Sequence, residues 1–265
     1  MKKIKVLLFG TRPLSVDICK LIKKSKYFDL IGIVSKRPNK KAWWDKDIYF
    51  HKKENFISEN KIKKINFDLG ISINWEKLIK KEILNLPKYG FINIHNSYLN
   101  ILRGRNIFFH CISGNKYFRD NFGCTLHSMN EKFDDGKILK SKKIKIEITD
   151  TSWDLYKKFN IAAKEIFKRY LGNLDNLEKF KKFKKKKTFY FKKKLNLNKN
   201  FSKMEPDINF YNKIRALDFP GFVPPYVKIN GKKKYLFIKK NKKRKIFKKL
   251  KFKKNNYNIY FSKTY

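Results

Sequence analysis

The sequence is poor in cysteine and contains no long apolar run. Its three cysteines, Cys19, Cys111 and Cys124, show no CxxC spacing, so neither a disulfide framework nor a zinc site is predicted. No stretch approaches the roughly 20 apolar residues of a membrane-spanning helix. The apolar run near the N-terminus ends at Gly10 and is too short for a signal peptide. We therefore expect a cytoplasmic protein with no membrane anchor and no bound metal.

Arginine and acidic residues are also scarce. Only eight of the 67 basic residues are arginine, and only 22 acidic residues oppose them, which leaves a formal net charge of +45. Proteins that recognise phosphates or bases favour the planar guanidinium group, so a lysine surplus indicates compositional bias more than nucleic-acid recognition. The chain is 42% hydrophobic and 16% aromatic. This content excludes a disordered polycation, because it supplies the side chains of a large core.

Strand and helix patterns alternate in the first 150 residues. Short apolar or alternating runs predict strands at 5–9, 30–35, 67–73, 90–95, 123–129 and 138–148. Helical periodicity predicts helices at 14–22, 75–84 and 108–113. Such alternation indicates an α/β fold, with a Rossmann-like, mostly parallel sheet and helices on both faces. Ligands of such sheets bind beyond the carboxyl ends of the strands.

The second part of the chain has a different pattern. A helix is expected after Thr151, with Asp154 completing a capping box. Beyond it lie short β-like runs, with turns expected at Asn230-Gly231 and near Asn255-Asn256. Residues 151–265 carry a net charge of +28, against +17 for residues 1–150. We expect one domain at 1–180 and a small, basic, β-rich C-terminal region at 181–265.

Two groups of residues are candidates for catalysis. Asn93 and His95 end an apolar strand, where residues two apart project on the same face. A carboxamide can donate to an oxyanion and an imidazole can take a proton from an amine, which suits acyl transfer. A turn-forming Asn and a histidine at the core edge would give the same pattern. The run Asp134-Asp135-Gly136 is either a plain turn or the source of a carboxylate for the histidine, and physics alone does not separate its two aspartates.

Four ordered motifs resemble those of the folate-dependent formyltransferases over roughly residues 1–170. NIHNSYL at 93–99, followed by Arg103-Gly104, is similar to the signature N-x-H-x-S-L-L-P-x-x-R-G, and DDGKI at 134–138 is similar to D-x-G-x-I. FGTRP at 9–13 and FGCTLHSM at 122–129 are similar to the family's F-G-T start and its G-x-T-x-H strand. Each motif is weak alone, whereas four in order are specific.

The resemblance implies that residues 1–180 are a catalytic domain that moves a formyl group from 10-formyltetrahydrofolate to an amine without a metal. The family's Asn, His and Asp fall on Asn93, His95 and Asp134. By this analogy Asn93 stabilises the oxyanion, His95 handles the amine proton, and Asp134 orients and charge-balances His95.

Folate contacts are expected by the same analogy in two segments. The residues concerned are Asn74, Trp75, Leu78, Ser97, Tyr98, Leu99 and Asn100. Asn100 stands where the family signature has proline, which changes the expected pocket. For Trp75 and Leu78, packing of an ordinary helix is the alternative explanation.

The acceptor amine differs among enzymes of this family: methionyl-tRNA, glycinamide ribonucleotide or a nucleotide-linked amino deoxysugar. The sugar enzymes resemble this chain most, because they carry R-G-x-N, as at 103–106, a W-D pair, as at Trp44-Asp45, and a short tail similar to 214–226. Fewer residues follow residue 180 than the barrel that the tRNA enzyme adds. The resemblance therefore implies an N-formyltransferase acting on a nucleotide-linked amino sugar, in surface-polysaccharide synthesis.

Contacts to the sugar substrate are expected from a second set of residues. These are Arg103, Arg105, Asn106, Phe222 and Tyr226. Phe222 and Tyr226 are candidates for stacking on a nucleotide base, and the alternative is that their Pro-rich segment covers a sheet edge. The expected partners are small-molecule substrates, with a homodimer also compatible with the sugar enzymes. A tRNA partner is expected only for a methionyl-tRNA enzyme or for a non-catalytic nucleic-acid binder, and a binder has no need of Asn93, His95 and Asp134 together.

Overall fold

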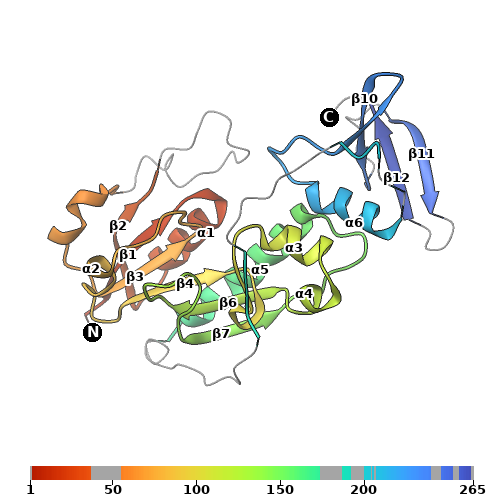
Figure 1. Ribbon diagram of the computed structural model, residues 1–265. Coiled ribbons are helices and arrows are strands. Elements are labelled where there is room, and N and C mark those ends of the chain that lie inside the picture. The colour runs from red at the N-terminus through yellow and green to blue at the C-terminus, as the bar shows by residue number, and fades with distance from the viewer. Residues whose placement is uncertain are drawn as a thin grey trace. The chain divides into compact units, whose positions relative to one another are not determined.

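The structure is a computed structural model in which two compact units are distinguished (Figure 1). It describes residues 2–36, 55–173, 187–191, 200–203, 205, 207–239, 246–252 and 257–263. Unit 1 comprises Met1–Gly104, Gly123–Ile144 and Lys158–Tyr190, and unit 2 comprises Arg105–Phe122, Lys145–Lys157 and Phe191–Tyr265. The Trp44-Asp45 pair and the turn expected at Asn255-Asn256 lie outside the described residues. The domain boundary near residue 180 also falls outside them and stays a prediction.

Unit 1 contains a six-stranded sheet with the strand order β2-β1-β3-β4-β6-β7. Its strands are β1 (Ile4–Gly10), β2 (Phe28–Val34), β3 (Leu69–Ile73), β4 (Phe91–His95), β6 (Gly123–Ser128) and β7 (Ile138–Lys143). Strands β1 to β4 pair in parallel, whereas β6 pairs antiparallel with both β4 and β7. Within this sheet only β6 therefore runs antiparallel to the other strands. The predicted mostly parallel α/β sheet is confirmed. β7 ends at Lys143, so the extended segment expected at 138–148 is shorter than predicted.

Helices and short elements lie between these strands or follow β7 along the chain (Figure 1). They are α1 (Arg12–Lys23), the 3-10 helices η2 (Glu59–Lys64) and η3 (Tyr98–Asn100), α2 (Lys81–Leu84), β5 (Leu102–Gly104), α5 (Ser152–Tyr170) and β8 (Phe189–Phe191). The capping box of α5 is present: the Thr151 N–H donates to Asp154 Oδ2 at 3.0 Å, and the Asp154 N–H donates to Thr151 Oγ1 at 3.2 Å. None of the helices in the described ranges is long and apolar enough to cross a membrane.

The helix predicted at 75–84 is wrong over most of its length, because only Lys81–Leu84 is helical. Asn74 has a φ of 51° and turns the chain out of the strand direction. Trp75 then packs edge-on against Phe9, with ring centroids 5.8 Å apart. The apolar spacing that suggested a helix comes from individual loop residues that pack on the core. Trp75 and Ile79 contact the core, whereas Leu78 is 54% exposed.

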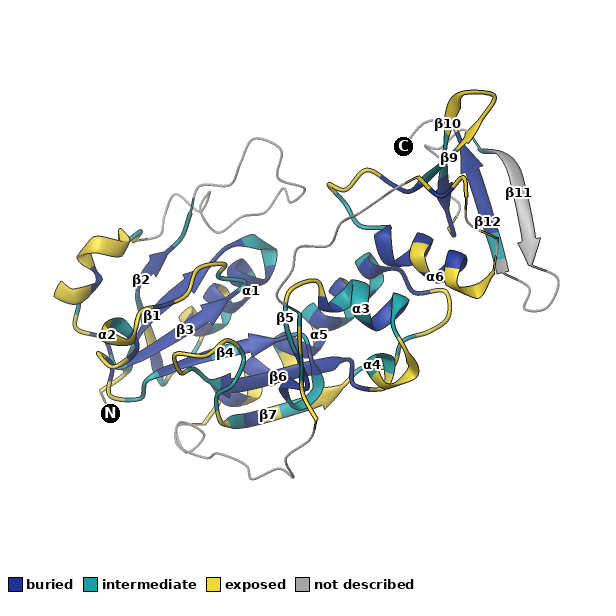
Figure 2. Ribbon diagram, viewed as in Figure 1, coloured by how far each residue is buried: buried dark blue, intermediate teal, exposed yellow. Residues whose placement is uncertain are grey.

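The core of unit 1 lies along the central strands. Figure 2 shows β1, β3, β4 and β6 buried over most of their length, as their runs of apolar residues require when both sheet faces are covered. Phe91 meets both Phe9 and Phe67 edge-on, with ring centroids 5.3 and 5.9 Å apart. The strand that carries Asn93 and His95 is therefore held by dense packing, which gives their side chains a rigid base.

Unit 2 combines helices with a four-stranded antiparallel sheet of order β11-β12-β10-β9. Its elements are α3 (Ile107–Ser113), α4 (Lys116–Asp120), α6 (Ile208–Leu217), β9 (Tyr226–Ile229), β10 (Lys232–Phe237), β11 (Ile246–Phe252) and β12 (Tyr257–Ser262). The predicted β-rich C-terminal region and the Asn230-Gly231 hairpin are confirmed, with both turn residues at positive φ. α6 was not predicted. It begins at the N-cap Asp207, whose side chain accepts from the Phe210 N–H.

A buried arginine joins α6 to the loop before α5 within unit 2. Arg215 is 1% exposed and donates to Asn212 Oδ1 at 2.9 Å and to the carbonyl oxygens of Asp150 and Glu147 at 2.8 and 3.2 Å. We expect Arg215→Met to lower the free energy of unfolding by about 2 kcal/mol, because these buried acceptors lose their donor. Urea denaturation measures this. The exposed Lys213 on the same helix is the control, and Lys213→Met should cost less than about 1 kcal/mol.

Candidate active site

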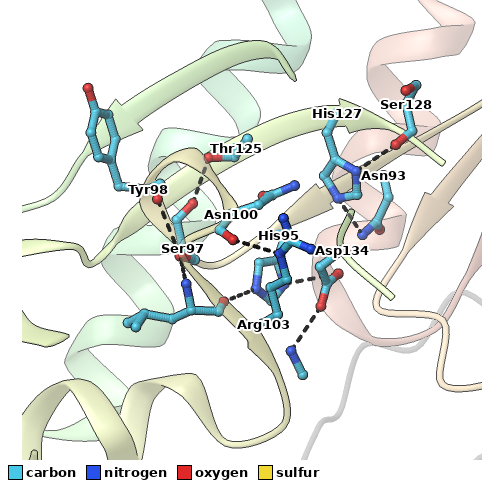
Figure 3. Close-up of polar contacts among 12 residues, drawn as sticks. Asn93, His95, Ser97, Tyr98, Asn100, Arg103, Thr125, His127, Ser128 and Asp134 are labelled. Atoms are coloured by element: carbon cyan, nitrogen blue, oxygen red, sulfur yellow. Dashed lines mark hydrogen bonds and ion pairs between the residues drawn. The ribbon is translucent and has the colours of Figure 1, made fainter. Parts of the chain in front are cut away.

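The pairing of β4 with β6 brings four polar side chains to one face of the sheet (Figure 3). Asn93 lies opposite His127, and His95 lies opposite Thr125. Directly opposed residues of an antiparallel pair share a face, and so do residues two apart on one strand. The prediction that Asn93 and His95 project together is therefore confirmed, and two residues of the G-x-T-x-H strand join them.

His95 is held between a backbone carbonyl and a carboxylate. Its Nε2 lies 2.6 Å from the Leu102 carbonyl oxygen, and its Nδ1 lies 3.4 Å from Asp134 Oδ1. A carbonyl oxygen only accepts, so Nε2 carries a hydrogen. In the neutral ring the lone pair is then on Nδ1, on the side of Asp134. Nδ1 is the basic atom of this site, and His95 itself is 7% exposed.

The structure separates the two adjacent aspartates. Asp134 has a φ of 53°, and its carboxylate both faces His95 and accepts from the Gly104 N–H at 3.0 Å. Asp135 instead pairs with the guanidinium of Arg103. Gly136 makes this turn close against β6, because a Cβ there would lie 1.5 Å from the Ser128 carbonyl oxygen. The Asp-Asp-Gly run is thus a turn that directs one carboxylate to the histidine and the other to an arginine.

A second histidine lies on the other side of Asn93. His127 Nδ1 is 2.7 Å from the Ser128 carbonyl oxygen, and its Nε2 is 3.2 Å from Asn93 Nδ2. His127 is 1% exposed. Burial lowers its pKa to about 4, and this effect outweighs the opposite pull of the Asp134 carboxylate. His127 is therefore neutral at physiological pH.

The low pKa of His127 predicts a loss of stability in acid. An unfolded histidine titrates near 6.5, so between pH 6.5 and about 4 the unfolded chain binds a proton that folded His127 does not. The free energy of unfolding should fall in this window, by up to about 1.4 kcal/mol per pH unit from this group. Urea denaturation at stepped pH measures the slope. His127→Gln should make it shallower, and an unchanged slope would contradict the assignment.

A network of hydroxyl groups positions the loop after β4. Thr125 Oγ1 lies 2.6 Å from the Ser97 carbonyl oxygen and 2.7 Å from Ser141 Oγ. Ser97 Oγ accepts from the Leu102 N–H at 2.8 Å, and Ser141 Oγ accepts from the Leu99 N–H at 3.0 Å. Through Leu102, this network fixes the carbonyl that sets the tautomer of His95. Ser97 is fully buried, so its side chain serves the loop in this structure.

The remaining predicted folate residues lie in two turns of unit 1. Leu99 and Asn100 have positive φ values of 53° and 51°. Asn100 is 2% exposed, and neither the nitrogen nor the oxygen of its side-chain amide has a hydrogen-bond partner among the described residues. Tyr98 is half-buried beneath Lys143, whose Nζ lies 5.1 Å from the ring. The Asn74 carbonyl accepts from Thr11 Oγ1 at 2.9 Å, which joins the turn after β3 to the turn after β1.

The predicted substrate residues are divided between the units. Arg103 belongs to unit 1, where it pairs with Asp135. The other four lie in unit 2: Arg105, Asn106, Phe222 and Tyr226. Arg105 and Asn106 are exposed before α3, Phe222 is 47% exposed and packs on Phe219, and Tyr226 packs edge-on against Tyr235. Their roles stay predictions.

Sequence reasoning assigned no role to His127, Thr125 or Ser141. The first two stand two apart in the G-x-T-x-H motif, so the strand period alone places them on one face. What the sequence lacked was the pairing register of β4 with β6, which puts them opposite Asn93 and His95. Ser141 had no motif to mark it. Among the described residues, no group of three or more His, Cys, Asp or Glu could hold a metal ion.

The chain is similar in sequence to several known proteins. The 34% identical bifunctional polymyxin resistance protein ArnA of Wigglesworthia glossinidia brevipalpis matches over 161 residues, 60% of this chain and 24% of that protein. GDP-perosamine N-formyltransferase of Brucella melitensis is 30% identical over 170 residues, 64% of each chain. The chain thus spans less than two thirds of the length of both. Methionyl-tRNA formyltransferase of Prochlorococcus marinus subsp. pastoris is 29% identical over 240 residues, 81% of this chain and 72% of that protein.

Two solved structures share the fold. WlaRD, a sugar 3N-formyl transferase crystallised with dTDP and 5-N-formyl-THF, superposes with a TM-score of 0.70 at 23% identity, covering 99% of this chain and 98% of its own. The N-formyltransferase from Helicobacter canadensis, in complex with folinic acid and dTDP-3-aminofucose, gives 0.69 at 20% identity and covers 98% and 99%. A family model described as formyl transferase matches residues 2–171, well over half of the sequence, and the chain therefore belongs to the formyl transferase family.

Proposed function

We propose that this chain is an N-formyltransferase that moves a formyl group from 10-formyltetrahydrofolate to the amine of a nucleotide-linked amino deoxysugar. The observation that carries the chemistry is the arrangement of Asn93, His95 and Asp134 on one edge of unit 1. A donor amide, a histidine with its lone pair on a defined nitrogen and a carboxylate facing that nitrogen are the groups that acyl transfer to an amine needs.

The proposed reaction follows from these atoms. The acceptor nitrogen attacks the formyl carbon, and its C–N bond forms as the carbonyl oxygen becomes an oxyanion. Asn93 Nδ2 donates to that oxygen. His95 Nδ1 takes the proton of the attacking amine, and the resulting imidazolium is balanced by Asp134, whose oxygen lies 3.4 Å away. Transfer of this proton to the donor nitrogen of the folate lets its bond to the formyl carbon break, which releases tetrahydrofolate and the formamide.

The choice of a sugar acceptor rests on sequence and on the relatives. The run 103–106 keeps the R-G-x-N of the sugar enzymes. Two sugar N-formyltransferases of known structure match from end to end, covering at least 98% of each chain. A nucleotide-linked sugar is an anion, and a net charge of +45 favours its approach. We also propose a cytoplasmic location and a homodimer. Size-exclusion chromatography with light scattering would test the homodimer.

A methionyl-tRNA acceptor is the second candidate. It is favoured by one observation: the match to a methionyl-tRNA formyltransferase extends over 81% of this chain. A tRNA substrate would give binding that falls steeply with salt, because each neutralised phosphate releases counterions.

The deciding experiment offers the purified protein both acceptor classes with 10-formyltetrahydrofolate. We expect a mass gain of one formyl group on a dTDP- or GDP-linked amino deoxysugar from a panel that covers 3-amino and 4-amino isomers. Formylation of charged initiator tRNA, with no sugar in the panel modified, would overturn the sugar assignment. A His95→Ala protein serves as the control for uncatalysed transfer.

A further inference from the structure

His127 lies directly behind the proposed oxyanion donor and has no role in the reaction above. We propose that His127 is a positioning residue that holds the NH2 group of the Asn93 carboxamide through one N–H and leaves the second N–H for a ligand oxygen. The consequence for catalysis rests on the proposed function. The orientation itself is a property of the free protein, and it can be tested without any substrate.

The hydrogen-bond partners of His127 determine its tautomer. The Ser128 carbonyl oxygen, 2.7 Å from Nδ1, only accepts, so Nδ1 carries the hydrogen. The neutral ring then has its lone pair on Nε2, which is the nitrogen 3.2 Å from Asn93 Nδ2. An acceptor at that place requires the NH2 of Asn93, and not its carbonyl oxygen, to face His127. The tautomer of one side chain thus sets the orientation of the other.

The groups around His127 keep it neutral. Asp134 favours the protonated ring, whereas His95 and Arg103 oppose it. Burial opposes it most strongly, since the ring is 1% exposed within the sheet. Near neutral pH the His127 ring therefore stays neutral, and Nε2 keeps its lone pair as a hydrogen-bond acceptor. His127 and His95 form a pair of opposite tautomers, because His95 carries its hydrogen on Nε2.

This arrangement gives the Asn93 amide a fixed direction. Nδ2 bears two hydrogens in the plane of the amide, and His127 takes one of them. Fixing the first N–H fixes the second, which remains for a ligand oxygen. A donor that is oriented before the reaction needs no reorganisation when the oxyanion forms. With a hydrogen on Nε2 instead, the amide would have to turn over and present Oδ1 to the ring, and the donor would be lost.

The first test measures the tautomer directly. In protein labelled with ¹⁵N-histidine, two-dimensional NMR distinguishes the two neutral tautomers and the cation. We expect His127, assigned by loss of its signals in His127→Gln, to remain in the neutral Nδ1–H form between about pH 6 and 8. A hydrogen on Nε2 at these pH values would overturn the proposal. This result does not depend on which acceptor the enzyme uses, or on whether it transfers a formyl group at all.

The second test measures whether His127 acts through Asn93. We expect His127→Leu to lower kcat about 10- to 100-fold, since one transition-state donor is misplaced, with KM changed less than about 3-fold. His127→Gln should recover most of the loss, because its Oε1 can accept from the same N–H. In an Asn93→Ala background, His127→Leu should cost almost nothing further. An equal loss in both backgrounds would mean that His127 acts elsewhere, and would overturn the proposal.

Discussion

Asp134→Asn is expected to lower kcat about 10³- to 10⁴-fold, while Asp135→Asn lowers it less than about 10-fold. The two residues are adjacent, but only Asp134 faces His95 Nδ1, at 3.4 Å. An amide at this place cannot balance the imidazolium charge, and its NH2 can occupy the lone pair that must receive the amine proton. Asp135 pairs with Arg103, so its loss changes the setting of an arginine and not the proton transfer.

This pair of variants is its own control. Both remove one negative charge from the same turn, so a general electrostatic effect would lower the two rates alike. An asparagine at 134 keeps an oxygen that can accept from the Gly104 N–H, so the turn should still form. Steady-state kinetics with the formylated acceptor as product, and circular dichroism for folding, provide the measurements. Equal rates for the two variants would contradict the role given to Asp134.

The α/β class of the fold was predictable because its signals are local. Apolar runs such as 5–9 and 90–95 can be recognised as strands from their neighbouring residues alone, and the structure has a strand at each. The helix expected at 75–84 failed for the opposite reason. Its apolar residues are anchors of a loop that follows the left-handed Asn74, and spacing alone does not distinguish such anchors from a helix face. α6 was not predicted, because the chain beyond Gly172 was expected to form short β-like runs.

The chemistry of the site was predictable only in part. Motifs identified Asn93, His95 and the acidic turn, and analogy selected Asp134. The physical reason for that selection is a φ of 53° and a bond from the Gly104 N–H, neither of which can be seen in the sequence. His127 was within a quoted motif, yet its proposed role depends on the pairing of β4 with β6, which puts it opposite Asn93, a residue 34 positions earlier in the chain.

Restoring the proline of the formyltransferase signature, by Asn100→Pro, is expected to lower the free energy of unfolding by about 3 kcal/mol or more. Proline fixes φ near −65°, whereas Asn100 has a φ of 51°. The residue before a proline is also kept out of helical conformations, and Leu99 has φ 53° and ψ 28°. A substitution that brings the sequence closer to its family should therefore damage this protein. Urea denaturation measures the loss.

Asn100→Gly is the matched control, because glycine adopts a positive φ without strain. It also removes an amide whose two polar atoms have no partner among the described residues, so the net change should stay within about 1 kcal/mol. The catalytic rate should also depend on the backbone conformation of this loop, because the loop ends at Leu102, whose carbonyl oxygen lies 2.6 Å from His95 Nε2. The proline variant should therefore have a lower kcat, and the glycine variant should keep the kcat of the parent. A proline variant as stable as the parent would show that the loop changes its conformation at little cost. The left-handed pair at 99–100 would then be a consequence of the asparagine and not a requirement of the site.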